Sequence, residues 1–403
     1  MILHRANVYR LEPTEEQAAS FGQWAGACRF VYNLALEQRR TWGRDHCLSY
    51  NQQQSELTQL RAEYDWLMAV PVHALQMAVR SLDNAYQRLF CGLGEYPAPR
   101  KKFVDDSFTE PDPACLGFKR LNKNKGAIRF PKVGWVKFVG FRKLGGRLRS
   151  VTITRKAGHW YASVAWDREI PDPDPSNLPS VGIDRGVKVF VACSDGTMIN
   201  PVNAFKASQD KLARLQRKLA RKKRFGENWK KQKAKITRLH HKISCIRKDF
   251  LHKQSVTIAQ SHGTVKVEKL QVQNMTASAK GTAEQPGTNV RAKSGLNRSI
   301  LDQGWGMFRG FLGYKLAERG GRLEEVNPAY TSQTCSECGV VDRASRRDQA
   351  SFVCVACGYS DNADTNAAKN IHQARALAVE SPKRTLRRVG KRKQTVGAIH
   401  AVV

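Results

Sequence analysis

The sequence predicts a multidomain α/β protein in which a β-rich unit with a helical insertion precedes a second α/β unit that contains a cysteine-bound metal ribbon. The apolar pattern changes near residue 117 from a helical period to the two-residue alternation of strands. The proline-rich segment 171–179 separates this part from the rest of the chain, and two Cys-x-x-Cys pairs follow near the C-terminus. A chain of 403 residues is long enough for two or three domains.

The N-terminal part is expected to begin with a strand and to continue as helices. Thr14 followed by Gln17 is a capping-box pattern, in which each side chain binds the backbone N–H of the other residue, so a helix should begin there. In order, we expect a strand at 2–10, helices at 14–40, 50–62 and 72–90, and a loop at 91–116. Strand alternation then covers 117–170 and includes a hairpin that turns at 156–159.

The second part mixes strands and helices. Strands are expected at 181–183, 187–193, 265–267 and 322–326, and helices at 301–319 and 366–379. Residues 206–253 predict a helical hairpin that turns at Gly226, because apolar residues recur at steps of three and four on both sides of it. The two apolar stripes are Leu212, Leu215 and Leu219, then Ile236, Leu239, Ile243, Ile246 and Phe250. Residues 276–297 are rich in Ser, Thr, Gly and Lys and predict a mobile loop.

The charge of the chain indicates the kind of partner that it binds. Lys and Arg number 68 against 35 Asp and Glu, a formal net charge of +33. Self-repulsion of this size is tolerated when a polyanion neutralises it, so nucleic acid is the expected partner. The helical hairpin alone holds 18 basic residues and three acids. A protein that binds an anionic membrane surface and a ribosomal protein are the alternatives for a basic chain. The sequence has no run of about 18 apolar residues, so a membrane span is not expected.

Four cysteines form one cluster in the sequence. They are Cys335, Cys338, Cys354 and Cys357, two Cys-x-x-Cys-Gly knuckles with 15 residues between them. Two residues between thiols let one tight turn bring both sulfurs to one ion, and the glycine permits the positive φ of that turn. We therefore expect one structural zinc ion with four thiolate ligands. The other six cysteines are scattered singly, which is typical of a reduced cytoplasm.

Three acids are candidates for a catalytic metal site. Asp184 and Glu268 each follow a short buried strand, and Asp364 precedes the last expected helix. Taken singly, Asp184 suits a turn, Glu268 an exposed strand edge, and Asp364 or Thr365 a helix cap. Together they would hold two Mg²⁺ ions, which activate water for phosphodiester hydrolysis and prefer oxygen ligands. Asp361 is the near competitor of Asp364 for this role.

Six stretches resemble the TnpB family, the transposon-borne relatives of the type V CRISPR effectors. In the order of that family they are Arg-Phe-Val-Tyr-Asn at 29–33, Gly-Ile-Asp-Arg-Gly at 182–186, Val-Glu-Lys-Leu with Asn-Met at 267–275, Asp-Gln-Gly-Trp-Gly-Met-Phe at 302–308, Thr-Ser-Gln-Thr-Cys-Ser-Glu-Cys-Gly at 331–339 and Asp-Thr-Asn-Ala-Ala-Lys-Asn-Ile at 364–371. The set covers nearly the whole chain.

The resemblance implies a domain order. It implies an N-terminal β-barrel, called the wedge, at 1–10 and 117–172, a helical recognition domain at 11–116, a RuvC-type, RNase H-like nuclease domain at 180–330 and 361–379, and a zinc ribbon that binds target nucleic acid at 331–360. The basic residues 380–403, in which Glu380 is the one acid, are expected to form a disordered tail.

The resemblance also implies an activity and its residues. The activity is RNA-guided DNA cleavage beside a short adjacent motif, with Mg²⁺ or Mn²⁺ at Asp184, Glu268 and Asp364 and zinc at the four cysteines. The partners are a guide RNA from the transposon end and double-stranded target DNA, in the prokaryotic cytoplasm or nucleoid. Tyr50 and Gln76 are expected to read the flanking DNA. A nuclease-inactive RNA-guided repressor and a transposase stay open as alternatives.

Overall fold

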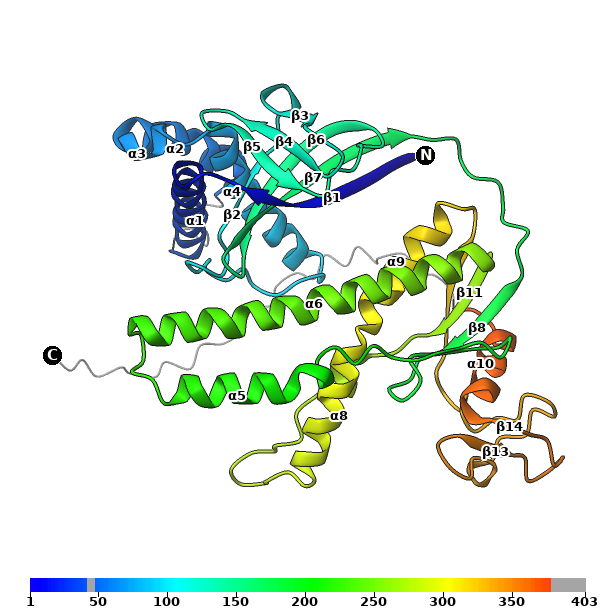
Figure 1. Ribbon diagram of the computed structural model, residues 1–403. Helices are drawn as coiled ribbons and strands as arrows, with labels where there is room; N and C mark the ends of the chain where they lie inside the picture. The colour runs from blue at the N-terminus through cyan, green and yellow to red at the C-terminus, as the bar shows by residue number, and fades with distance from the viewer. Residues whose placement is uncertain (42–47, 378–403) are drawn as a thin grey trace. The chain divides into compact units, whose positions relative to one another are not determined.

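The computed structural model describes residues 1–41 and 48–377, shown in Figure 1. Within these residues the chain divides into two compact units. Residues 2–169 form one unit, and Met1 with residues 170–377 forms the other. The expected linker at 171–179 therefore begins where the second unit begins. The tail expected at 380–403 lies outside the described residues.

The strands of residues 2–169 form one seven-stranded antiparallel sheet. They are β1 (Ile2–Glu12), β2 (Ser107–Glu110), β3 (Gly117–Arg120), β4 (Lys125–Phe130), β5 (Gly134–Val139), β6 (Arg147–Lys156) and β7 (His159–Glu169). Their order is β2-β6-β7-β1-β5-β4-β3. The pairing of β1 with β7 and β5 joins the two sequence segments predicted to form one β unit. Closure of the sheet into a barrel stays a prediction.

One strand of this sheet differs from our expectation. We predicted a loop throughout 91–116, but β2 lies at the edge of the sheet and pairs with β6. Phe108 and Glu110 are its two buried residues. Four residues are too few to show a convincing alternation, and the neighbouring prolines favour a loop, so local sequence alone missed the strand.

The helices of this unit are α1 (Glu15–Thr41), α2 (Tyr50–Glu63), α3 (Asp65–Met68) and α4 (Val72–Phe90). The capping box is confirmed, because Thr14 N donates to Gln17 Oε1 at 3.1 Å and Gln17 N donates to Thr14 Oγ1 at 3.3 Å. The buried ring of Phe21 on α1 contacts Phe108, Phe130 and Trp160 of the sheet, with centroids 5.5–5.6 Å apart. Aromatic packing thus fixes α1 on the sheet.

The second unit is built on a five-stranded sheet. Its strands are β8 (Ser180–Asp184), β9 (Val191–Cys193), β10 (Met198–Ile199), β11 (Thr264–Glu268) and β12 (Arg322–Val326), in the order β10-β9-β8-β11-β12. β8, β11 and β12 are parallel, whereas β9 runs antiparallel to β8. The strand expected at 187–193 begins only at Val191, because residues 187–190 bend between β8 and β9. The two-residue β10 was not predicted.

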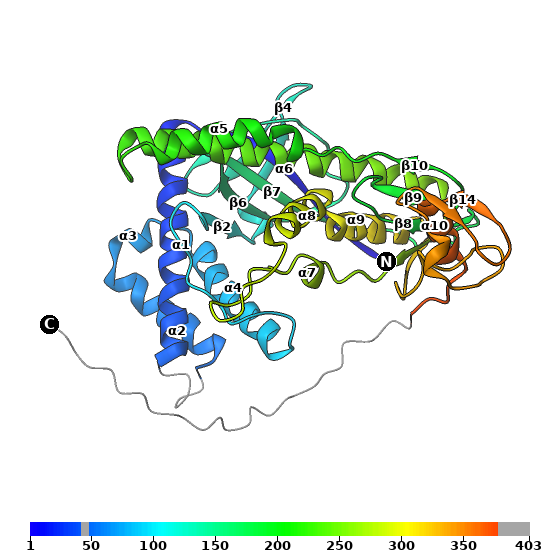
Figure 2. The same cartoon turned by 90° about the horizontal axis from the view of Figure 1, so that it is seen from below.

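Six helices occur in the described part of this unit, namely α5 (Gln209–Ala220), α6 (Glu227–Ser261), α7 (Val272–Met275), α8 (Val290–Gln303), α9 (Trp305–Ala317) and α10 (Ala363–Gln373). α5 and α6 run side by side as the expected hairpin, which Figures 1 and 2 show from two directions. Leu212, Leu239 and Ile243 form its buried seam. Ile246, which we placed in the seam, is 39% exposed, because α6 continues past the end of α5.

Three helix boundaries differ from those predicted. α8 begins at Val290, inside the segment predicted as a loop at 276–297, and the helix predicted at 301–319 is broken between α8 and α9. Gly304 separates the two with a φ of +69°, a left-handed conformation that favours glycine. α10 ends at Gln373, earlier than the expected Val379. Over the described residues, none of the helices has both the length and the apolar character of a membrane span.

The short elements complete the chain. They are the 3₁₀ helices η1 (Pro113–Cys115), η2 (Lys206–Ser208) and η3 (Arg343–Ser345), and the paired strands β13 (Ser351–Val353) and β14 (Ser360–Asn362). β13, β14 and η3 belong to the segment that carries the four clustered cysteines.

Candidate functional site

Three carboxylates converge at one edge of the five-stranded sheet. Asp184 is the last residue of β8, and Glu268 is the last residue of the adjacent parallel strand β11. Because the carboxyl ends of parallel strands meet at the same edge of a sheet, the two side chains are neighbours. Asp364 lies in the first turn of α10, which packs on β8.

Small residues allow the helix to approach the strand. Ala367 and Ala368 of α10 are buried against the sheet, as their size predicted. Gly182 of β8 lies directly beneath them. A Cβ atom at Gly182 would be 2.2 Å from the carbonyl oxygen of Ala368 and 2.4 Å from the backbone nitrogen of His372. Glycine at this position therefore sets how close Asp364 comes to the strand ends.

The electrostatics show that the acids affect one another. Burial raises the pKa of Asp184 to about 7, and the charges of Glu268 and Asp364 add to the shift. Burial also raises the pKa of Glu268 and of Asp364. A divalent cation would stabilise the ionised form of neighbouring carboxylates whose pKa values are raised in this way. Such carboxylates are typical of functional sites.

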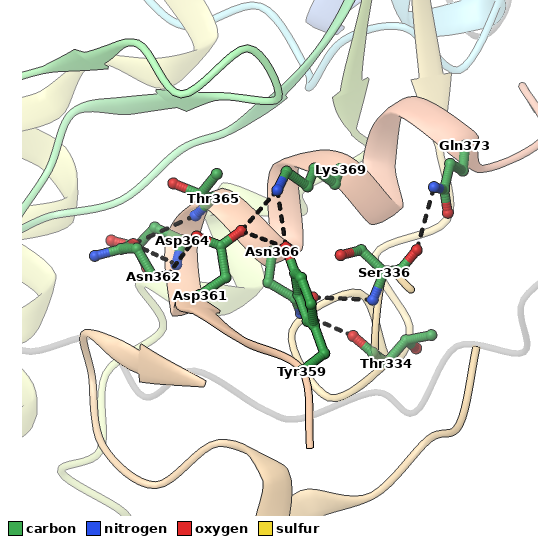
Figure 3. Close-up of polar contacts among 10 residues, drawn as sticks. All are labelled: Thr334, Ser336, Tyr359, Asp361, Asn362, Asp364, Thr365, Asn366, Lys369 and Gln373. Atoms are coloured by element: carbon green, nitrogen blue, oxygen red, sulfur yellow. Dashed lines mark hydrogen bonds and ion pairs between the residues drawn. The ribbon is translucent and has the colours of Figure 1, made fainter. Parts of the chain in front are cut away.

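The structure also separates Asp364 from its competitor. The carboxylate of Asp361 accepts hydrogen bonds from Lys369 Nζ and the Tyr359 hydroxyl, both at 2.8 Å (Figure 3). Asn362, which we had not considered, caps α10 by accepting from the backbone N–H groups of Asp364 and Thr365. Our suggestion that Asp364 or Thr365 caps the helix was wrong, because the amide oxygen of Asn362 already fills that position.

The three carboxylates offer the oxygen ligands that Mg²⁺ prefers, although their oxygen atoms do not all lie within 4.8 Å of one another. Among the described residues, only two groups bring three or more ligand atoms within 4.8 Å of one another: the four cysteines, and His73 with Asp112 and Cys115. Three carboxylates that flank a pair of ions about 4 Å apart need not all lie within that distance. Oxygen ligands on one side leave room for water and a phosphate, as Mg²⁺ sites commonly do.

Sequence reasoning missed three residues beside the acids. Thr331 donates its hydroxyl proton to Glu268 Oε1 at 2.6 Å, and the buried Arg185 donates to the Glu268 carbonyl oxygen. Arg346 Nη2 lies 3.5 Å from Asp364 Oδ1. Arg185 directly follows Asp184, and Thr331 opens the segment before the first cysteine knuckle, so their positions were visible in the sequence. Their contacts depend on the tertiary fold and were not.

The four clustered cysteines have the geometry of a zinc ribbon. Sγ of Cys335 lies 3.7 Å from Sγ of Cys357, and Sγ of Cys338 lies 3.6 Å from Sγ of Cys354. A tetrahedron with Zn–S bonds of about 2.3 Å has sulfur atoms about 3.8 Å apart. Gly339 and Gly358 have φ of +75°, which is the turn predicted after each knuckle. The cluster consequently fits one four-coordinate structural zinc.

The ribbon is tied to the helix that carries Asp364. Asn366 Nδ2 donates to the carbonyl oxygen of Thr334, and Asn366 Oδ1 accepts from Ser336 N, at 2.8 and 2.9 Å (Figure 3). One turn later, Asn370 Nδ2 donates to the carbonyl oxygens of Thr331 and Thr334. Both asparagine side chains are at least nine-tenths buried, so these bonds are strong determinants of position.

Tyr50 and Gln76, the predicted DNA-reading residues, lie in the other unit on neighbouring helices. Arg80 of α4 donates to the Tyr50 hydroxyl at 3.3 Å, and Gln54 of α2 donates to the Gln76 carbonyl oxygen at 3.1 Å. Both residues therefore border the seam between α2 and α4. The side chain of Gln76 is exposed, whereas that of Tyr50 is partly buried.

Comparison with known proteins identifies relatives over nearly the full chain. Residues 163–279 match a family described as "Probable transposase", residues 305–371 match "Cas12f1-like, TNB domain", and residues 1–45 match "Helix-turn-helix domain". The chain is 41% identical to "Putative RNA-guided DNA endonuclease InsQ" of Escherichia coli K12, over 90% of both chains. It is 31% identical to a "Putative RNA-guided DNA endonuclease" of Streptomyces pristinaespiralis, over 91% of this chain and 88% of the other.

A solved structure shares the fold. The chain is similar to the protein in "Cryo-EM structure of the Cas12f1-sgRNA-target DNA complex", with a TM-score of 0.58 and 16% identity. The match covers 89% of this chain and 83% of the other. At this identity the likeness establishes a common multidomain α/β architecture.

Proposed function

Because the chain belongs to the TnpB (OrfB) family, we propose that it is an RNA-guided DNA endonuclease that cuts target DNA by Mg²⁺-dependent hydrolysis. The observation that carries the proposal is the meeting of Asp184, Glu268 and Asp364 at one sheet edge in a strongly basic chain. The relatives supply the class of activity, and the acids supply a place for the chemistry.

The proposed nuclease centre is of the RuvC type. Asp184, Glu268 and Asp364 would hold two Mg²⁺ ions, which supply an activated water and stabilise the leaving oxygen of a phosphodiester. The chain's own residues orient these acids. Thr331 holds one oxygen of Glu268, Arg185 holds the backbone of the same residue, and Gly182 lets α10 bring Asp364 close.

The remaining domains are proposed to hold nucleic acid. A guide RNA would pair with one DNA strand, so that base pairing reads the sequence and the protein contacts backbones. The α5–α6 hairpin offers a predominantly basic surface suited to phosphates, and the ribbon would contact the target. The sheet of residues 2–169 is the proposed wedge, and its helices are the proposed recognition domain.

The proposal is tested by the RNA that the protein carries and by the DNA that it cuts. Protein purified without nuclease treatment should retain an RNA of defined sequence. A plasmid with a matching target should be cut in Mg²⁺ or Mn²⁺, but not in EDTA or with zinc alone. Absence of a bound RNA would contradict guided cleavage, and guided binding without cutting would place the chain among nuclease-inactive repressors.

Thr331→Val should slow cleavage without releasing zinc. Loss of a hydrogen bond to a buried charged group costs about 1.5–3 kcal/mol, which corresponds to roughly a 10- to 100-fold lower cleavage rate if Glu268 must be held to act. Thr331→Ser keeps the hydroxyl and should restore most of the rate. Single-turnover cleavage and zinc content should be measured on all three proteins. Equal rates for Thr331→Val and wild type would remove Thr331 from the site.

Gln76→Ala should change the preference for DNA beside the target. A glutamine amide can bond to the N6 and N7 atoms of adenine, and each such pair contributes about 1–3 kcal/mol of discrimination. Cleavage of a library with randomised flanks measures the preference. Gln87→Ala, also exposed and on α4, is the matched control. An unchanged preference in Gln76→Ala would exclude this residue, and Tyr50→Phe would then test the neighbouring position.

A further inference from the structure

A second cluster of metal-binding side chains lies in the unit formed by residues 2–169. The segment Glu110-Pro111-Asp112-Pro113-Ala114-Cys115 joins the end of β2 to η1 and carries three different donors within six residues. The first turn of α4 adds His73. Nothing in the proposed nuclease mechanism uses these side chains.

Distances within the cluster are close to the spacing of ligands around one ion. The donor atoms of His73, Asp112 and Cys115 all lie within 4.8 Å of one another. Cys115 Sγ lies 3.1 Å from Asp112 Oδ2, and His73 Nδ1 lies 3.3 Å from Glu110 Oε1. Ligands around a tetrahedral zinc ion are separated by about 3.3–3.8 Å, given bonds of about 2.0–2.3 Å.

The loop is held in this arrangement by its own backbone. Pro111 and Pro113 fix two φ angles, which reduces the conformational freedom that metal binding would otherwise have to remove. Asp112 caps η1 through Oδ1, which accepts from Ala114 N at 2.9 Å, so its other oxygen is turned to Cys115. The donor atoms of Asp112 and Cys115 are therefore brought together before any ion binds.

The buried carboxylate of this cluster favours the binding of a cation. The carboxylate of Glu110 is buried, since the residue is only 2% exposed. A buried carboxylate is costly unless a positive charge compensates it. The side chain of His73 is 41% exposed, so the cluster is open to solvent on one side and an ion can enter.

We propose that His73, Asp112 and Cys115, with Glu110 as a fourth donor, bind one divalent transition-metal ion of the zinc class. An imidazole nitrogen and a thiolate beside carboxylate oxygens suit Zn²⁺ or Co²⁺, whereas Mg²⁺ prefers oxygen alone. The ion replaces the His73–Glu110 and Asp112–Cys115 hydrogen bonds and ties the β2–η1 segment to α4. This site is independent of the nuclease assignment and of the cysteine ribbon.

The test is a count of metal ions per chain in the full-length protein. Metal analysis by mass spectrometry should give two zinc equivalents for the wild type, one from the ribbon and one from this cluster. His73→Ala and Cys115→Ser should each lower the count from two to one. Cys91→Ser is the matched control, since Cys91 is an exposed free cysteine near the end of α4, and it should keep two equivalents.

A second measurement covers the case in which a variant folds poorly. Wild-type protein stripped by a chelator should take up two equivalents of Co²⁺, and the visible spectrum of the second should show ligation by a single thiolate rather than four. A wild-type count of one zinc, or a count of two that His73→Ala and Cys115→Ser both leave unchanged, would overturn the proposal. So would a single Co²⁺ equivalent.

Discussion

Asp184→Ala is expected to abolish target cleavage while leaving guide and target binding nearly intact. Asp184 ends β8 beside Glu268 and has the most strongly raised pKa of the three acids, because it is buried between the other two charges. Removing it takes away a ligand shared by the proposed ions. The loss of several kcal/mol of transition-state stabilisation corresponds to a rate at least about 10³-fold lower. Binding depends on Lys and Arg residues spread over the chain and should not fall.

The measurement is plasmid cleavage beside a gel shift on the same preparations. Asp361→Asn is the matched control, because Asp361 is also an aspartate close in sequence to Asp364, yet its carboxylate is bonded to Lys369 and Tyr359. It should cut within a few-fold of the wild type, whereas Asp364→Asn should not cut. Wild-type cutting by Asp184→Ala or Asp364→Asn would overturn the assignment of the nuclease centre.

Cys335→Ser is expected to release one zinc equivalent per chain and to stop cleavage without unfolding residues 2–169. Each thiolate is needed to close the tetrahedron, and structural zinc contributes about 10–16 kcal/mol of binding energy in isolated zinc-finger peptides. The ribbon has only a small core, formed by Cys335, Phe352, Cys354 and Ala363. Without the ion that core should not hold its fold.

Cleavage should fail with the ribbon because Thr331 and Thr334 begin it and bond to Glu268, Asn366 and Asn370. Metal analysis and limited proteolysis measure the local change. Cys245→Ser, an exposed cysteine on α6, should keep both zinc and activity. A Cys335→Ser variant with the same zinc content and the same proteolysis pattern as the wild type would contradict the zinc assignment.

The sequence could predict the fold wherever a local pattern was long. The helices at 72–90 and along 206–253 have clear apolar periods, and the cysteine spacing alone defined the ribbon. Short elements were missed, because β2 and β10 have only four and two residues. The break at Gly304 was also missed, since a glycine within a helical pattern can be tolerated without ending the helix.

The candidate site was predictable in its acids but not in their support. Strand ends and a helix start are visible as patterns, so Asp184, Glu268 and Asp364 were recognisable, with the family resemblance deciding between Asp364 and Asp361. The hydroxyl of Thr331 lies 63 residues from Glu268 in the chain, and Asn370 lies 39 residues from Thr331. Contacts over such separations carry no local signal and depend on how α10 and the ribbon fold together.

The glycine beneath α10 has a consequence for judging which homologous chains are still active. Because both atoms nearest to a Cβ at Gly182 are backbone atoms, no rotamer change can make room, and a single methyl group must displace the helix. A Gly182→Ala chain should keep every acid and every cysteine and yet cut poorly, and normal cutting by that variant would show that the helix can shift at little cost. A homologous chain can therefore lose nuclease activity during evolution and still keep all three acids. A survey that counts these acids alone would classify such an inactive chain as active.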